Sequence, residues 1–198
     1  MINLSKENYI NQGTFQKCYT HPENENLCIK IKINENHEDP RVDREIKYYK
    51  KIQKKKIRGS FLARYHGTID TNYGLGYVYD LVKDETTNKI SSTVAEYLNM
   101  PNSPISHDDL EFKFNEIKNK LIKYKIVIRD LTGKNVCCKI RKDNSIELVI
   151  IDGVGHRDFI PLVDWFQCFT KRKVNKIFLT KKLFSMEQHK NWLASNFD

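Results

Sequence analysis

One stretch of the sequence decides how the rest of the chain is interpreted: Ile128-Arg129-Asp130-Leu131-Thr132-Gly133-Lys134-Asn135. A second acidic residue, Asp152, closes the apolar run 148–151 and precedes a glycine. A short loop brings Asp130 and Asn135 to one point, and a β-hairpin after it returns the chain so that Asp152 emerges at the same end. One carboxylate to orient a nucleophile, with an asparagine and a second carboxylate to hold magnesium, is the residue set of a phosphoryl-transfer site. The alternative is a charged turn before an ordinary hairpin.

The composition is that of a globular protein. The chain has 198 residues, 39% hydrophobic and 30% charged, which suffices for one domain or two small lobes sharing a cleft. No apolar run approaches the ~18 residues of a membrane span, and the N-terminus lacks the build of a signal peptide. Five scattered cysteines without a CxxC pair are typical of reduced thiols, so we expect a cytoplasmic protein without a zinc site.

The charge balance is basic, because 34 Lys and Arg residues against 25 Asp and Glu residues give +9. This excess favours contact with nucleic acid, acidic lipid or nucleotide. An AT-rich coding sequence produces the same richness in Lys, Asn and Ile, so specific nucleic-acid binding is not expected. The basic segments 171–173 and 181–182 predict a positive surface near the site, which favours an anionic acceptor or partner.

Residues 10–19 have the pattern of a β-turn-β phosphate loop. Gly13 and Thr14 lie in its turn, and Cys18 stands where an apolar side chain would cover an adenine. Asn11 and Gln16 replace the outer glycines of a three-glycine loop, and asparagine tolerates a left-handed backbone. A single glycine is also what an ordinary hairpin turn contains, so the loop by itself leaves both interpretations open.

Residues 27–33 alternate with period two, which predicts a strand with Cys28, Lys30 and Lys32 on one face. In the phosphoryl-transfer interpretation Cys28 lies against the adenine and Lys30 on the phosphates. We prefer Lys30 to Lys32, since the other register would set the charged Lys30 against the adenine ring. The alternative is a half-buried strand whose lysines are in solvent.

Asp39 and Pro40 are expected to open a helix, as its N-cap and first residue. Its apolar face at helical spacing comprises Val42, Ile46, Tyr49 and Ile52. Glu45 flanks this face 15 residues after Lys30, so we expect an ion pair that holds Lys30 on the phosphates. An exposed helix glutamate is the alternative.

Two strands, 61–69 and 76–82, are predicted around a turn at 71–74, and the backbone of Asp80, Leu81 and Val82 is expected to bond the adenine edge. Further helices are predicted at 92–100, 163–173 and 181–196. The longest helix starts at a capping box, 106–109, and its apolar face comprises Leu110, Phe114, Ile117 and Leu121. A hairpin joins 136–140 to 146–151 across 143–145. The expected core anchors near the C-terminus are Trp165, Phe166, Phe169 and Trp192.

The order of these parts resembles the protein-kinase-like superfamily: glycine loop, strand lysine, helix glutamate, hinge, Arg-Asp loop, then Asp-Gly. Within it the chain is most similar to the YrbL family of PhoP-network proteins. The segments that carry this resemblance, besides Gln12-Gly13 and the short length, are Val127-Ile128-Arg129-Asp130-Leu131-Thr132-Gly133-Lys134-Asn135 and Ile150-Ile151-Asp152-Gly153-Val154-Gly155-His156-Arg157-Asp158-Phe159-Ile160-Pro161.

The resemblance implies an α+β, protein-kinase-like two-lobed fold, with an antiparallel-sheet N-lobe over residues 1–82 and a reduced helical C-lobe over 83–198. It implies ATP and Mg2+ as cofactors. The catalytic candidates are Asp130, Arg129 and Lys134, and the metal ligands are Asn135 and Asp152. The nucleotide-binding candidates are Gly13, Thr14, Cys18, Cys28, Lys30, Glu45, Asp80, Leu81 and Val82.

The chain departs from the kinase pattern at several positions. Ile128 stands where typical kinases have histidine, and Thr132 where many have a lysine, whose charge Lys134 would supply. Only 46 residues follow Asp152, too few for a full activation segment. We therefore expect a small ATP-dependent phosphotransferase whose acceptor is a protein side chain, a lipid-linked sugar or a small molecule. The alternative is a kinase-fold regulator that acts through protein contacts.

Overall fold

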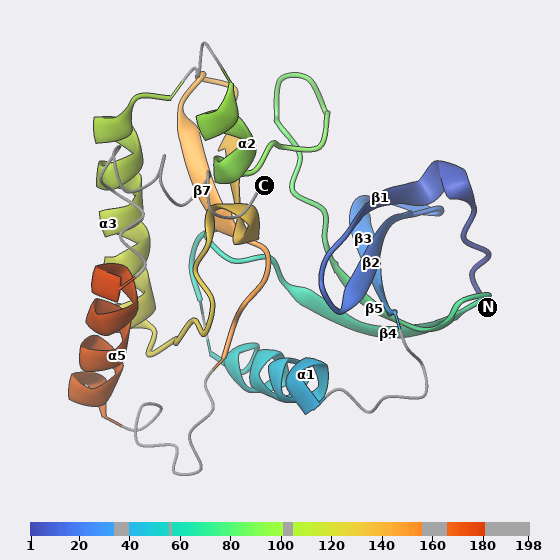
Figure 1. Ribbon diagram of the computed structural model, residues 1–198, viewed down its shortest axis with the longest axis horizontal. Helices are drawn as coiled ribbons and strands as arrows, with labels where there is room; N and C mark the ends of the chain where they lie inside the picture. The colour runs from blue at the N-terminus through green and yellow to red at the C-terminus, as the bar shows by residue number, and fades with distance from the viewer. Residues whose placement is uncertain (34–39, 56, 101–104, 156–165, 181–198) are drawn as a thin grey trace.

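A computed structural model of the chain describes residues 1–33, 40–55, 57–100, 105–155 and 166–180. These residues form a five-stranded antiparallel sheet, a two-stranded hairpin and several helices (Figure 1). The class is therefore α+β, as the sequence predicts. Within the described residues, no helix is long and apolar enough to cross a membrane.

The five-stranded sheet has the order β1-β2-β3-β5-β4, with every neighbouring pair antiparallel. Its strands are β1 (Tyr9–Gln12), β2 (Gln16–His21), β3 (Asn24–Lys32), β4 (Tyr65–Thr71) and β5 (Gly74–Asp80). The predicted period-two alternation of β3 is confirmed. Cys28 belongs to the main core, while Ile29 and Ile31 pack into a smaller cluster on the opposite face.

The strand predicted over 61–69 starts later than expected, because β4 begins only at Tyr65. Residues 61–63 instead lie against the strand β7 (Ile146–Ile150). Ala63 N–H donates to the Ile150 carbonyl, Ile150 N–H donates to the Phe61 carbonyl, and both distances are 2.9 Å. An apolar run shows that a segment is buried, but it does not show which strand is its partner.

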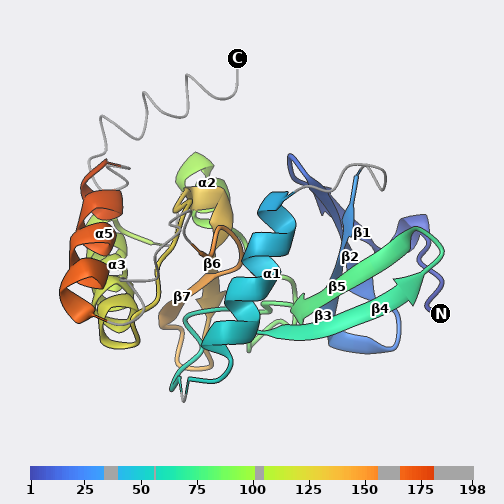
Figure 2. The same ribbon diagram turned by 90° about the horizontal axis from the view of Figure 1, so that it is seen from below.

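Helix α1 (Pro40–Ile52) lies between the sheet and the hairpin (Figure 2). Pro40 is its first residue, as predicted, whereas Asp39 lies outside the described residues. The four residues of the predicted apolar face are buried. The Tyr49 ring meets that of Tyr79 on β5 at 5.4 Å, edge to face, so α1 is fastened to the sheet by aromatic packing.

The 3-10 turn η1 (Lys6–Asn8) lies beside β2 of the sheet. The remaining elements pack around the hairpin formed by β6 (Val136–Ile140) and β7. They are the 3-10 turn η2 (Gly133–Asn135) and the helices α2 (Val94–Asn99), α3 (His107–Lys123) and α5 (Gln167–Thr180), of which α5 packs on α3. The Ser106 hydroxyl caps α3 by accepting from the Asp109 N–H at 3.1 Å. The predicted apolar face of α3 is buried. The predicted turn between the two hairpin strands is confirmed, and its exposed residue Asn144 has φ 61°.

Helix α5 corrects the expectations near the C-terminus. It runs to Thr180 rather than ending at 173. Phe166 and Phe169 are 52% and 41% exposed, so they are not core anchors among the described residues. Val174 and Phe178 are buried instead, and the Phe178 ring lies 6.5 Å from Phe114 on α3. Trp165, Trp192 and the helix expected at 181–196 lie outside the described residues.

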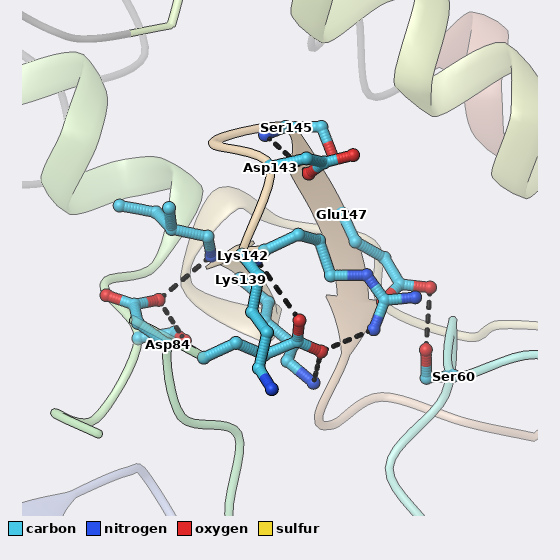
Figure 3. A network of polar contacts seen from close by, with 11 residues as sticks. Ser60, Asp84, Lys139, Lys142, Asp143, Ser145 and Glu147 are labelled. Carbon is cyan, nitrogen blue, oxygen red and sulfur yellow. Dashed lines mark hydrogen bonds and ion pairs between the residues drawn. The ribbon is translucent and has the colours of Figure 1, made fainter. Parts of the chain in front are cut away.

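The connection after β5 is tied to the hairpin by a polar network that we call the linker clamp, formed by Asp84, Glu85, Ser91, Lys139 and Arg141 (Figure 3). The Glu85 carboxylate lies 3.0 Å from the Lys139 ammonium and 2.6 Å from the Arg141 guanidinium. These two partners lower the pKa of Glu85 to about 2. The linker clamp therefore holds the segment that leaves β5 against the hairpin of β6 and β7, which leads to the candidate site.

Candidate functional site

The chain around Asp130 is held by a close backbone contact with Gly153. The N–H groups of Arg129 and Asp130 both donate to the Gly153 carbonyl, at 2.7 and 3.2 Å. Gly153 has φ +77°, and a Cβ on it would lie 2.2 Å from the Asp130 carbonyl oxygen. Only glycine fits this position. The glycine that follows Asp152 in the sequence is therefore a steric requirement of the loop.

Asn135 connects Asp130 to the end of the hairpin. Its side-chain N–H group donates to the carbonyl and the carboxylate of Asp130, at 3.1 and 3.3 Å. Its backbone carbonyl accepts from the Ile151 N–H at 2.9 Å, next to Asp152. The structure thus brings Asp130, Asn135 and Asp152 together, as the spacing of the sequence predicts.

Lys30 joins the sheet to this cluster. Its ammonium donates to the Ile151 carbonyl at 3.0 Å and to the Asp152 carboxylate at 3.3 Å, and it lies 4.8 Å from the centre of the Tyr79 ring. Only 8% of Lys30 is exposed. Lys32, by contrast, pairs with Asp43 at 3.0 Å. Of the two lysines, Lys30 is the one that reaches the cluster.

The expected ion pair between Lys30 and Glu45 does not form. Glu45 is buried and its carboxylate lies 3.6 Å from the Arg129 guanidinium, so Arg129 is turned toward α1. Burial and the nearby Asp152 carboxylate raise the pKa of Glu45 to about 8. Burial also opposes ionisation of Asp152, but the Lys30 ammonium and the Gly153 N–H hold its pKa below the ordinary value.

The physical reason for this exchange is that two buried carboxyl groups share one lysine. Like charges at close range favour one protonated and one ionised carboxyl group. Asp152 stays ionised and forms the ion pair with Lys30, whereas the protonated Glu45 carboxyl group donates a hydrogen bond to Asp152. The sequence shows that both carboxyl groups are present, but it does not show the distance between them. It therefore could not predict which of the two pairs with Lys30.

Helix α1 also contacts the segment that leads to Asp130, through Tyr48, a residue that the sequence analysis does not single out. The Val127 N–H donates to the buried Tyr48 hydroxyl at 2.9 Å. Tyr48 lies one turn after Glu45, so both residues face the loop from the same side of the helix. That spacing is the signal from which Tyr48 was predictable.

The turn between β1 and β2 is closed by a hydrogen bond from the Gly13 N–H to the Gln16 carbonyl at 2.8 Å. A Cβ on Gly13 would meet only the Gln16 oxygen, at 3.7 Å, so the turn does not require glycine. Thr14 is exposed. Cys18, farther along β2, is half-buried and lies opposite Lys30 in the strand register.

The backbone expected to bond an adenine edge is largely committed to other partners. The Asp80 N–H donates to Arg64 at 3.0 Å, and the Leu81 N–H donates to Asn26 at 2.8 Å. Asp80 and Leu81 therefore cannot serve as backbone donors to a ligand without breaking these hydrogen bonds. Val82 offers a carbonyl that accepts from the Ser91 N–H at 3.0 Å. The sequence pattern does not show such competition for donors.

Lys134 lies exposed on η2, and the turn that carries it packs tightly on α2. A Cβ on Gly133 would lie 3.0 Å from the Ala95 nitrogen. This close contact fixes the position of η2 against α2.

The oxygen donors of the cluster fit a magnesium ion. The Asn135 amide nitrogen is held by Asp130, so its oxygen, for which the described residues provide no donor, is the group open to a cation. Asp152 adds a carboxylate. Across the described ranges, no group of three or more His, Cys, Asp or Glu side chains is arranged to hold a metal. Two protein ligands still suffice for magnesium, which keeps several waters or phosphate oxygens.

The fold and the site define a mixed α+β protein whose antiparallel sheet places a lysine against an acidic and amide cluster. The family described as PhoP regulatory network protein YrbL matches residues 2–183, so the chain belongs to this family. The chain is 32% identical over 178 residues to the protein named Uncharacterized protein YrbL of Escherichia coli (strain K12), covering 89% of this chain and 84% of that one. The protein of the same name from Shigella flexneri matches equally.

Proposed function

We propose that the protein is a small phosphotransferase that uses ATP and Mg2+, built as a reduced protein-kinase-like fold. In this proposal residues 1–82 form an N-lobe, residues 83–198 form a reduced C-lobe, and the protein works in the cytoplasm on an anionic acceptor. The observation that carries the proposal is the 3.3 Å ion pair between Lys30 and Asp152 beside the Asp130–Asn135 hydrogen bond. It joins Lys30 to three residues that lie about a hundred positions later in the sequence, and together the four supply the charges and ligands that phosphoryl transfer needs.

The proposed roles follow from the chemistry of each group. Lys30 binds phosphate oxygens, and Asn135 and Asp152 supply hard oxygen ligands to magnesium. Asp130 orients the acceptor hydroxyl, and Lys134, which is exposed on η2 next to Asn135, adds a further positive charge. When bound, magnesium neutralises part of the negative charge of the phosphates. Positioning and charge neutralisation carry the rate of such transfers, because little covalent chemistry is left for the protein.

The nucleotide base is proposed to lie against Cys18, Cys28 and Val82, with Gly13 and Thr14 over the phosphates. Cys28 is buried on the same strand face as Lys30, which supports this order along the strand. In this proposal Glu45 positions Arg129 by their ion pair and Asp152 by a hydrogen bond, and it does not pair with Lys30.

The second candidate is a kinase-fold regulator that acts through protein contacts. Two observations favour it. Lys30 is engaged by Asp152, and the N–H groups of Asp80 and Leu81 are committed within the protein. A regulator of this type has no need of a magnesium-dependent nucleotide site.

Thermal unfolding with ATP, in the presence and absence of Mg2+, separates the two candidates. We expect ATP to raise the melting temperature of the wild type only with Mg2+, and Asp152→Asn to lose the rise. Asp143→Asn is the matched control, because Asp143 accepts from Ser145 at the far end of the hairpin. A rise that is independent of Mg2+, or that survives in Asp152→Asn, contradicts the phosphotransferase and favours the regulator.

A further inference from the structure

The exposed charged side chains of helix α1 are all basic. Six of the thirteen residues of this helix are buried, among them the acidic residue Glu45. Its other acidic residue, Asp43, forms an ion pair with Lys32. The helix lies at the front of the view in Figure 2, so its outer face is turned toward solvent. The exposed basic residues of this face and of the turn after it are Arg44, Lys47, Lys50, Lys51 and Lys54.

The end of α1 is fastened to the end of α3, and this joint extends the positive charge. The Lys55 ammonium donates to the carbonyls of Tyr124 and Lys125, at 3.0 and 2.7 Å, and the Arg58 N–H donates to the Tyr124 hydroxyl at 3.2 Å. Arg58 and Lys123 are exposed at this joint. Neither 46–58 nor 117–125 contains an acidic residue. We call the exposed residues Arg44, Lys47, Lys50, Lys51, Lys54, Arg58 and Lys123 the basic belt.

The protein does not balance this positive charge within its described residues. Elsewhere a surface lysine has a carboxylate partner, as Lys83 has in Glu25 at 2.9 Å. Among the described residues, by contrast, the belt residues Lys47, Lys50 and Lys54 have no carboxylate at ion-pair distance. The basic belt is therefore open to negative charge from outside the protein.

The basic belt also costs helix stability. Lys47 lies three positions from Arg44 and from Lys50 and four from Lys51, and like charges at these spacings repel each other on a helix. The helix dipole favours bases only in the last turn, where Lys50 and Lys51 lie. It does not account for Arg44 and Lys47. An anionic partner on this face would offset the repulsion.

The make-up of the basic belt separates the classes of anionic partner. Protein interfaces are rich in aromatic residues and poor in lysine, whereas five of the seven belt residues are lysines and none is apolar. Single-stranded nucleic acid is bound by stacking on aromatic side chains, and duplex DNA is read by an element that enters a groove. The belt has no aromatic residue, and α1 is embedded in the fold by its six buried residues. A planar anionic surface requires neither feature.

We propose that the basic belt is a peripheral binding surface for membranes that contain anionic phospholipids. Clusters of roughly four to eight basic residues bind such surfaces electrostatically. The lysine and arginine side chains contact the headgroup phosphates, and the protein stays outside the hydrocarbon region. The inference is independent of the phosphoryl-transfer proposal, because no belt residue belongs to the candidate site.

The first test measures co-sedimentation of the full chain with lipid vesicles at low ionic strength. We expect binding to vesicles of equal parts phosphatidylcholine and phosphatidylglycerol, and none to phosphatidylcholine alone. Added salt should weaken the binding, because it screens charges at the surface. Equal binding to both kinds of vesicle, or binding to neither, overturns the proposal.

A triple substitution assigns the binding to the basic belt. Each basic residue near an anionic surface contributes about fivefold to the partition coefficient, so glutamine at positions 47, 50 and 54 should lower it about a hundredfold. Arginine at the same positions should retain the binding. The melting temperature of the glutamine variant should equal or exceed that of the wild type, because repulsion on α1 is reduced.

The matched control removes the same charge elsewhere. It places glutamine at three exposed lysines outside the belt, Lys6, Lys89 and Lys142. This variant should bind anionic vesicles nearly as the wild type does. An equal loss in the belt variant and the control assigns the binding to net charge and overturns the belt.

A footprint on the wild type requires no variant. Anionic vesicles should slow the acetylation of Lys47, Lys50 and Lys54 by acetic anhydride and leave the three control lysines unchanged, as measured by peptide mass spectrometry. Uniform protection contradicts the assigned surface. Duplex DNA at the same phosphate concentration is the competing partner. If it protects the belt lysines more strongly than the vesicles do, the partner is nucleic acid and the membrane proposal fails.

Discussion

At the scale of the residue, the position of Asp130 depends on the missing side chain of Gly153. We expect Gly153→Ala to lower the free energy of unfolding strongly, because a Cβ there would lie 2.2 Å from the Asp130 oxygen at φ +77°. Gly59→Ala is the control, since Gly59 has φ +95° but no atom within 4 Å of the added Cβ. It should show only backbone strain, of order ~1–3 kcal/mol. Urea unfolding measures both, and equal losses would contradict the contact.

The choice between Lys30 and Lys32 is also a matter of single residues. Hydrogen bonds to charged groups contribute about 1.5–3 kcal/mol, so Lys30→Ala should raise the ATP dissociation constant about tenfold to a hundredfold. Lys32→Ala should change it little, because Lys32 pairs with Asp43 on α1. Titration calorimetry gives both constants. If the two variants weaken ATP binding equally, the assigned register has no functional meaning.

At the scale of the element, the buried Tyr48 hydroxyl attaches α1 to the segment that leads to Asp130. Tyr48→Phe should destabilise the fold by about 1–3 kcal/mol, because it leaves the buried Val127 N–H without its acceptor. Tyr49→Phe is the matched control. Its hydroxyl is buried and has no hydrogen-bond partner among the described residues, so its removal should be neutral or stabilising. The reverse order of the two free energies of unfolding would disprove the attachment.

The linker clamp should make stability depend on pH in acid. The pKa of Glu85 is lowered from 4.5 to about 2, so its contribution is complete above pH 4.5 and is lost as the pH falls toward 2. Glu85→Gln should therefore be less stable than the wild type at neutral pH, with a difference that shrinks across this window. Glu111→Gln, at an exposed position of α3, is the control. A difference that does not change with pH in acid would show that Glu85 is not clamped in its ionised form.

Elements were predictable from the sequence where local chemistry specifies them. The alternation of β3, the proline start of α1, the Ser106 cap and the hairpin turn each depend on neighbours in the chain. The predictions that were wrong depended on distant partners. The pairing of 61–63 with β7 and the exposure of Phe166 and Phe169 both follow from tertiary contacts. The internal partners of the Asp80 and Leu81 N–H groups are tertiary contacts too, and the sequence pattern does not show them.

The candidate site shows the same division. The convergence of Asp130, Asn135 and Asp152 was predictable, because a short loop and a hairpin determine it. The partner of Lys30 was not, because it depends on which of two buried carboxyl groups keeps its proton. Tyr48 was open to prediction from helical spacing but not from any known motif.

At the scale of the whole molecule, one buried cluster spans the sheet and the hairpin, and the ion pair between Lys30 and Asp152 joins them at the candidate site. Lys30 comes from the sheet and Asp152 from the end of the hairpin, and α1 lies between sheet and hairpin (Figure 2). The linker clamp holds the connection between the two parts. In the proposed function this arrangement places the phosphate-binding charge of one lobe against the metal ligands of the other.

The central claim is that Asp130 serves phosphoryl transfer, and the most direct measurement is the magnesium-dependent loss of the γ-phosphoryl group from labelled ATP. Mass spectrometry of candidate acceptors identifies where the group goes. We predict that Asp130→Asn binds ATP with a near-normal dissociation constant and turns over ~10²–10⁴-fold more slowly than the wild type, as losses of a general base do. Full turnover in Asp130→Asn, or a wild type that binds ATP and magnesium without any transfer, would contradict the account.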